Sequence, residues 1–395
     1  MPESWRLPSI LSATTQIGQI GPLLFLIFHA LLPRHVTFIR TIYVVLVIGA
    51  LSCLLLVFFW SKTAFIFGEE RSIGIYILNF SLALLDGTSS VTFLPFIGSK
   101  FVKEYIVPNY IGESFAALIP SVLSLIQNIG KEDKCHNVTR GNETFLEPVP
   151  FQPTYSVSVY FLLMFLLLVM STIAFSLVVF SKTGKQERKR ARQLNEKSEK
   201  SEKSEKNVNE ISTFVGTTNH KSEKIILLTI TGLVSFTCYG ILPAFQSYSA
   251  LPYGNQAFNL SVNLSYLLLP ISIIFTIWSY ECSVKRICIE FSLTLLVAIY
   301  IIVIGCLSPC PPLIDSWFGA FLIVLAWIVI QTMFLRVRCL AAARLERFGK
   351  KMLLFFGALT MGGQFFGGIA IYIVVDIYKM LKEKPQCVFD TSYCH

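Results

Sequence analysis

Long runs of apolar residues recur along the chain and are separated by short polar segments. Each run is long enough to cross a hydrocarbon core of about 30 Å as a helix. The runs lack the polar face of a surface helix in a soluble protein. The pattern therefore predicts ten membrane spans, at residues 8–31, 38–60, 72–98, 106–129, 157–181, 224–248, 257–280, 285–307, 318–337 and 350–376.

The composition agrees with this pattern. Hydrophobic residues make up 54% of the 395 residues and charged residues only 14%, whereas soluble domains carry about 25% charged residues. We therefore expect an all-α polytopic membrane protein. The first run is predicted to be a retained helix rather than a signal peptide, because it lacks a basic leader and a small-x-small cleavage site.

Residues 182–223 interrupt the apolar pattern. Their repeat "KSEKSEKSEK" mixes charges without an apolar period, which predicts a disordered linker. The linker separates an N-terminal bundle, 1–181, from a C-terminal bundle, 224–376, each with five spans, and a tail follows at 377–395. Two bundles joined in this way are typical of transporters with a substrate site near mid-membrane. The basic run "GKQERKRARQ" is either a stop-transfer anchor or a contact for anionic lipid headgroups.

The distribution of charge predicts the orientation. With both termini outside and the linker cytoplasmic, the inner segments hold 24 of the 33 Lys and Arg residues, as the positive-inside rule requires. The sequons "NVT" at Asn137 and "NET" at Asn142 then lie in an outer loop, where they can be glycosylated.

Four of the ten cysteines fall in outer segments: Cys135, Cys310, Cys387 and Cys394. An even number on the oxidising side permits disulfides in three pairings. We favour Cys310 with Cys387, which would tie the tail to the last outer loop. Free thiols are the alternative.

Carboxylates inside the spans are the first candidates for function. Glu290 and Asp376 lie near predicted span ends and are expected to snorkel towards water. Asp86 and Glu113 lie deeper, and neither of their spans contains a Lys or Arg. These two are expected to be protonated, hydrogen-bonded to nearby hydroxyls, or facing water.

Other polar and aromatic side chains of the spans extend this set. Hydroxyls beside Asp86 can bond to their own helix, and single polar residues often join helices. Together they predict an uncharged cavity with aromatic borders. The candidate substrate-binding residues are Asp86, Thr88, Ser89, Ser90, Thr92, Phe93, Glu113, Gln16, Gln19, Gln246, Tyr248, Asn259 and Trp327.

Such a cavity suits a neutral, hydroxylated or amide-bearing solute with a flat ring. The chain has no Walker motif or nucleophile elbow, which argues against ATP-driven transport and against an enzyme. Its five His residues lie at span ends or in loops, so no metal site is expected. No cofactor or nucleic-acid partner is predicted either; the bilayer is the expected surrounding.

Several blocks resemble a known family. "LLDGTSSVTFLPF" at 84–96 and "GESFAALIPSVLSLIQ" at 112–127 closely resemble the eukaryotic riboflavin transporter family of solute carriers. The similarity continues through "WRLPSILSATTQIGQIGPLL" at 5–24, "LPAFQSYSALPYGNQAF" at 242–258 and "SPCPPL" at 308–313.

The resemblance implies uptake of riboflavin across the plasma membrane without ATP or a sodium requirement. It also implies a fold like that of major-facilitator and equilibrative nucleoside carriers. Aromatic faces would stack on the isoalloxazine ring. Asp86, Glu113 and the hydroxyls would bond its polar edge or ribityl tail.

The family usually has an eleventh helix before the segment that reads "PESWRLP" here, and that helix lines the central cavity. This chain begins at that segment, so ten spans and an outside amino end are expected. Two alternatives stay open: a carrier of another neutral ringed solute such as a nucleoside, and a non-transporting membrane receptor. Protein partners are not predicted.

Overall fold

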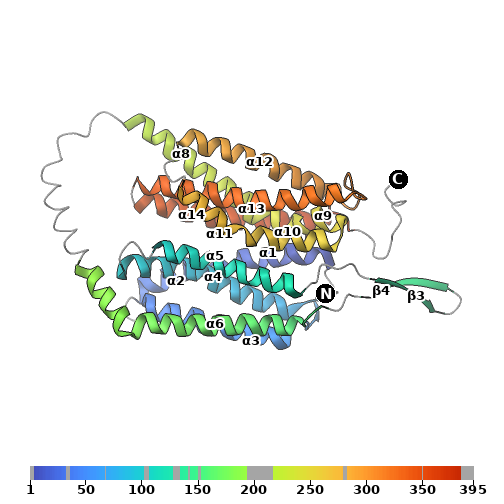
Figure 1. The fold of residues 1–395 in the computed structure, drawn as a ribbon, viewed down its shortest axis with the longest axis horizontal. Helices are drawn as coiled ribbons and strands as arrows, with labels where there is room; N and C mark the ends of the chain where they lie inside the picture. Colours follow the sequence, from blue (N-terminus) through green and yellow to red (C-terminus); the bar gives the residue numbers. More distant parts are fainter. Residues whose placement is uncertain are drawn as a thin grey trace. The chain divides into compact units, whose positions relative to one another are not determined.

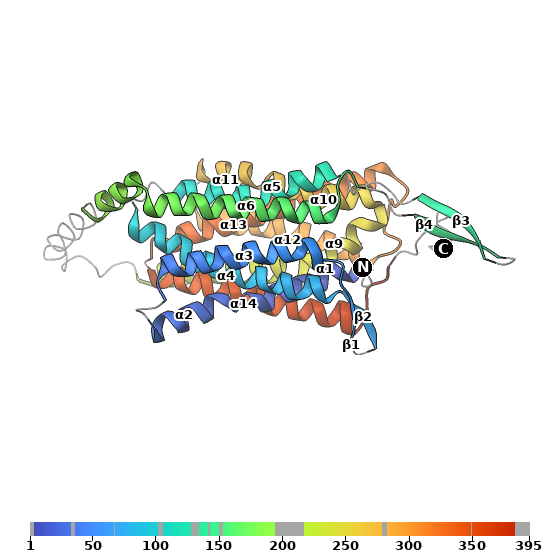
Figure 2. The same cartoon turned by 90° about the horizontal axis from the view of Figure 1, so that it is seen from below.

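The structure is a computed structural model. It describes residues 4–32, 36–66, 68–101, 106–127, 134–140, 143–149, 153–193, 217–278, 283–348 and 350–383. Helices make up nearly all of this part, and the strands within it form only two hairpins (Figures 1 and 2). Eight of its helical segments are long and apolar enough to cross a membrane. The prediction of an all-α polytopic membrane protein is confirmed.

In the first half of the chain, each predicted span coincides with helix. After a 3₁₀ turn, Ser4–Arg6, the helices are α1 (Leu7–Gly18), α2 (Gly21–Leu31), α3 (Phe38–Phe59), α4 (Ile73–Lys100), α5 (Ile106–Gln127) and α6 (Val157–Phe180). The hairpin strands are β1 (Ala64–Ile66) with β2 (Glu69–Arg71), and β3 (Lys134–Arg140) with β4 (Glu143–Val149), both antiparallel.

The described residues of the predicted spans in the second half are also almost all helical. Its elements are α8 (Thr217–Val234), the π-helical segment η3 (Ser235–Ile241), α9 (Leu242–Ala250), the 3₁₀ turn η4 (Leu251–Tyr253), α10 (Asn255–Leu267), α11 (Leu269–Trp278), α12 (Val284–Cys306), α13 (Trp317–Glu346), α14 (Lys350–Tyr372) and the π-helical segment η5 (Ile373–Ile377).

The structure departs from the sequence prediction in two places that bear on function. The span expected over 8–31 is one candidate membrane-spanning segment, Leu7–His29, but a turn at Gln19 and Ile20 divides it into α1 and α2. The linker expected to be disordered over 182–223 is helical at both ends, because residues 182–193 are helical and 217–223 belong to α8. Residues 194–216 lie outside the described part.

The chain forms two compact units, each built from separate stretches of sequence. The first unit contains residues 1–16, 114–160 and 227–395, and the second contains 17–113 and 161–226. Each unit is described by itself below.

In the first unit, α13 lies at the centre of the core. Its Trp327, Ile330 and Phe334 are almost fully buried and pack with Ile301 of α12. Glycines allow η3 to approach α14 closely: a Cβ added to Gly240 would lie only 2.6 Å from the Cα of Gly367. Such contacts between small residues let helices in a membrane associate without a hydrophobic driving force.

In the second unit, α3, α4 and α6 share a core. Ile42 of α3, Phe96 of α4 and Val179 of α6 are buried together. Polar contacts add to this packing: the Tyr43 hydroxyl donates to Ser176 Oγ at 3.0 Å, joining α3 to α6. Figures 1 and 2 show these two helices side by side.

Candidate functional site

The break in the first span lies against α4. Gln19 and Ile20 separate α1 from α2; the Ile20 N–H donates to the Ile17 carbonyl at 3.2 Å, and the Ile20 carbonyl accepts from Leu24 N–H at 3.1 Å. Pro22 stands in the first turn of α2, where its missing N–H costs no helical hydrogen bond. A helix break within a membrane span exposes backbone polar groups, and many transporters use such breaks to bind substrate.

Glycines bring this break close to α4. A Cβ on Gly18 would meet the Ala83 side chain, and one on Gly21 would collide with the Leu84 carbonyl. On the opposite side of the contact, a Cβ on Gly87 would lie 2.6 Å from Gln19 Oε1. All three positions therefore need glycine for the two helices to lie this close.

Asp86 lies at this contact and is exposed. Its Oδ2 accepts a long hydrogen bond of 3.4 Å from Gln19 Nε2. Gln19 is half-buried, and the neighbouring Ile17 and Ile20 are 52% and 46% exposed. The structure thus brings together two predicted site residues, a carboxylate and an amide, at the surface of the second unit. We call Gln19 and Asp86 the break site.

The hydroxyls that follow Asp86 bond to their own helix. Thr88 donates to the Leu84 carbonyl at 2.7 Å, Ser89 to the Asp86 carbonyl at 2.6 Å, and Thr92 to the Thr88 carbonyl at 2.9 Å. Thr88 and Thr92 are also buried. These three hydroxyls therefore bond within their own helix, as single hydroxyls in spans often do. Ser89 is half-buried.

Of the three other candidates in α4 and α5, Phe93 has a described side chain. Phe93 is half-buried and packs on Phe175 of α6, with ring centroids 6.1 Å apart. The side chains of Ser90 and Glu113 lie outside the described part, although both residues are within helices.

The remaining candidates belong to the first unit. Trp327 is buried and its indole N–H donates to Ser249 Oγ at 3.1 Å, next to the buried Tyr248. Gln16 is buried and donates to the Tyr239 carbonyl at 2.8 Å. Asn259 accepts two hydrogen bonds from the amide of Asn263. Gln246 is half-buried. Trp327, Tyr248 and Gln16 are thus buried between helices, which is typical of residues that join helices.

The N-terminal turn packs on the same unit. Trp5 makes an edge contact with Tyr248, with ring centroids 6.0 Å apart. Ser9 donates to Asp376 Oδ2 at 2.5 Å, and Arg6 lies 4.0 Å from Glu383. Asp376, expected to snorkel, is thus joined to α1 by a hydrogen bond.

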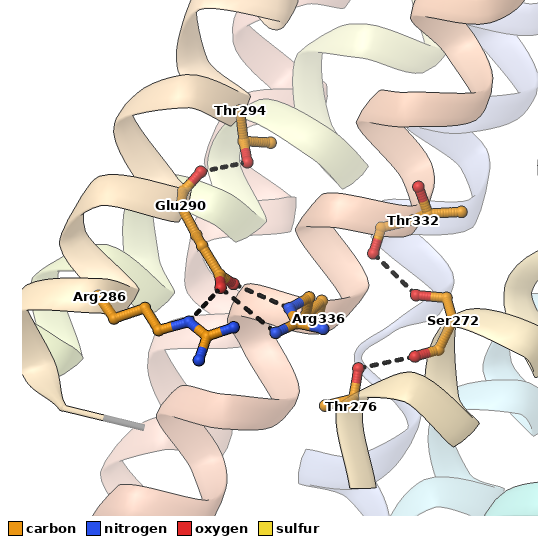
Figure 3. Close-up of polar contacts among 7 residues, drawn as sticks. All are labelled: Ser272, Thr276, Arg286, Glu290, Thr294, Thr332 and Arg336. Carbon is orange, nitrogen blue, oxygen red and sulfur yellow. Dashed lines mark hydrogen bonds and ion pairs between the residues drawn. The ribbon is translucent and has the colours of Figure 1, made fainter. Parts of the chain in front are cut away.

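Glu290 was expected to extend towards water, but two arginines bind its carboxylate. Arg336 of α13 donates to both carboxylate oxygens of Glu290 on α12, at 2.9 and 3.3 Å, and Arg286 donates at 3.1 Å (Figure 3). The side chains of Glu290 and Arg336 are only 15% and 17% exposed. Instead of extending to water, this carboxylate is held in a bidentate pair, which is geometrically specific.

The predicted modification sites are only partly described. Asn137 lies in β3, and Asn142 lies outside the described part. Cys310 is disulfide-bonded, whereas Cys53, Cys238, Cys288, Cys306 and Cys339 form no disulfide. The side chain of Cys135 is not described, and Cys387 and Cys394 lie outside the described part, so the pairing of Cys310 with Cys387 stays a prediction.

The comparison with protein families matches residues 1–383 to "Solute carrier family 52, riboflavin transporter". Among curated proteins, the chain is 30% identical over 411 residues to the zebrafish (Danio rerio) "Solute carrier family 52, riboflavin transporter, member 3-A", covering 98% of this chain and 91% of that protein.

More distant relatives align over a similar extent. The Caenorhabditis elegans "Riboflavin transporter rft-1" is 29% identical over 98% of this chain and 92% of its own length. The human "Solute carrier family 52, riboflavin transporter, member 3" is 26% identical over 98% of this chain and 92% of its own length. These matches do not favour the nucleoside carrier or the receptor.

Proposed function

Because the chain belongs to solute carrier family 52, the riboflavin transporter family, we propose that it is a membrane carrier that takes up riboflavin without ATP. The observation that carries this proposal is the family match over residues 1–383, nearly the whole chain. The relatives cited above are each named as riboflavin transporters, from fish, worm and human.

We propose that riboflavin binds at the break site. The ribityl hydroxyls of riboflavin are donors, and a carboxylate such as Asp86 accepts several hydrogen bonds at once. The amide of Gln19 offers both a donor and an acceptor to the uracil-like edge of the ring. The support is that Asp86 is exposed and has one long hydrogen bond, to Gln19. The Asp86 carboxylate can therefore accept further hydrogen bonds from a ligand, whereas both oxygens of Glu290 already accept hydrogen bonds from arginines.

We propose that transport follows alternating access at the plasma membrane, with both termini outside and the linker 182–223 cytoplasmic. The charge distribution and the sequons at Asn137 and Asn142 support this orientation. The helix break supports a site within the second unit that changes its exposure, because broken helices recur in carriers that work this way.

Uptake of radiolabelled riboflavin into cells expressing the full chain tests the function. We expect saturable uptake that excess riboflavin or lumiflavin inhibits and uridine does not. Asp86→Asn keeps the size of the side chain and removes its charge. It should lower uptake about tenfold, since a hydrogen bond to a charged group contributes roughly 1.5–3 kcal/mol.

Asp315→Asn is the matched control, because Asp315 is an exposed carboxylate in the segment between α12 and α13. It should leave uptake unchanged. Background uptake by a wild-type chain that reaches the cell surface would contradict the carrier function. Uptake that survives Asp86→Asn would contradict only the role of the break site.

A further inference from the structure

A cleft of about 500 Å³ opens in the second unit, between the ends of α4 and α6. We call it the α4–α6 cleft. Phe93, Phe96 and Phe101 line it together with Phe175 of α6. The ring of Phe96 meets those of Phe175 and Phe101 edge to face, at 5.6 and 5.9 Å. A cavity with such walls accommodates hydrocarbon rather than a polar solute.

The helical residues 182–193 form the rim of this cleft. Thr183, Gly184 and Glu187 line it. The guanidinium of Arg188 donates to the carbonyls of Val178 and Val179, at 3.2 and 2.6 Å, in the last turn of α6. These bonds hold the rim helix in place against α6. Figure 1 shows it as the green helical turns that follow α6.

The outer face of the rim helix is strongly basic. Residues 182–193 contain six basic side chains and one acidic one. Five of the basic side chains are exposed: Lys182, Lys185, Lys189, Arg190 and Arg192. An apolar cleft and a basic surface thus adjoin at one end of the second unit. Neither contains Gln19 or Asp86 of the break site.

Glu187 adds a specific polar contact. It faces the cleft, and its Oε1 lies 3.8 Å from Arg190 Nη1. Its Oε2 is buried, and no donor among the described residues reaches it. A buried carboxylate oxygen of this kind is costly unless a donor satisfies it, so a ligand of the cleft needs a donor near its charged end.

We propose that the α4–α6 cleft binds an anionic phospholipid of the surrounding bilayer. One acyl chain lies in the cleft against the phenylalanines, the phosphate faces the exposed lysines, and a head-group donor such as the ammonium of phosphatidylserine bonds to Glu187 Oε2. Anionic lipids are concentrated in the cytoplasmic leaflet, where polybasic segments bind them. That leaflet is where the proposed orientation places the start of the linker. The site does not depend on which solute the chain carries.

Native mass spectrometry of the purified full chain, titrated with single lipids in detergent, tests this site. We expect phosphatidylserine to bind about tenfold more tightly than phosphatidylcholine, because lysines near the headgroup attract its net negative charge. Replacing Lys182, Lys185 and Lys189 together by Gln should remove most of this preference. Thr183→Trp, which fills the cleft from its exposed rim, should weaken the binding of both lipids.

The matched control replaces three exposed lysines elsewhere, Lys62, Lys221 and Lys285, by Gln; it should keep the preference for phosphatidylserine. Glu187→Gln should weaken the binding of phosphatidylserine but not that of phosphatidic acid, whose head group has no ammonium. Equal binding of phosphatidylserine and phosphatidylcholine by the wild-type chain would overturn the proposal. The proposal would also be overturned if the control variant lost as much of the preference for phosphatidylserine as the variant of Lys182, Lys185 and Lys189.

Discussion

Asp86 and Glu290 are both carboxylates in predicted spans, but their surroundings differ. Glu290 receives three hydrogen bonds from two arginines, and its side chain is 15% exposed. Asp86 is exposed, and the hydrogen bond it receives from a described side chain is a long one, from Gln19. A carboxylate with its partners already in place stabilises the fold, whereas one with spare acceptor capacity at a helix break can bind a ligand.

The same contrast holds for the helices that carry them. Glu290 joins α12 to α13 across a packed core. Asp86 lies where α4 meets the break between α1 and α2, and glycines there keep the backbones close. We therefore expect substitutions at the Glu290 pair to change stability and substitutions at the break site to change riboflavin uptake.

The largest expected effect is that of Glu290→Ala. It leaves Arg336, 17% exposed, without its carboxylate; removing one partner of a buried pair costs about 3–5 kcal/mol, and we expect the lower end because water reaches this pair. The melting temperature of the purified protein should fall by several degrees. Uptake per molecule at the cell surface should stay the same. An unchanged melting temperature for Glu290→Ala would contradict the structural role of this pair.

Next in size is Gly21→Ala. The added Cβ collides with the Leu84 backbone, so α2 must move away from α4, at a cost of about 1–3 kcal/mol. Because this shift separates Gln19 from Asp86, uptake should fall together with stability. Gly357→Ala is the control, since a Cβ there meets nothing within 4 Å. Full uptake by Gly21→Ala would show that the close contact is not needed.

Gln19→Ala should have a smaller effect. It removes the donor to Asp86, at a distance of 3.4 Å, and one proposed contact to riboflavin, for about 1 kcal/mol or a severalfold rise in KM. The melting temperature should not change. A fall in melting temperature without a change in KM would assign Gln19 to the fold instead.

Ser89→Ala should have the smallest effect. Its hydroxyl donates to the Asp86 carbonyl of its own helix, and such bonds stabilise a helix little, by less than about 0.5 kcal/mol. Uptake kinetics should therefore match the wild type. A tenfold loss would show that this hydroxyl leaves its helix to bind the substrate.

The sequence predicted the helices well because a membrane span is defined by length and apolarity. It missed the turn at Gln19 and Ile20 because the mean hydropathy of a long window hardly changes with one polar residue. The residues that could have indicated this turn are Gly18, Gly21 and Pro22, which flank it. The Glu290–Arg336 pair was not predictable, because its members are 46 residues apart and meet only in the folded core. The burial of Thr92 was not predictable either, since a helix that is apolar on all sides does not reveal which face packs.

The most direct test of the account is the affinity of the purified full chain for riboflavin, measured by quenching of flavin fluorescence. Asp86→Asn should raise Kd about tenfold, in line with the loss of hydrogen bonds to a charged group, while the melting temperature stays that of the wild type. An unchanged Kd for Asp86→Asn would contradict the claim that this carboxylate binds the substrate.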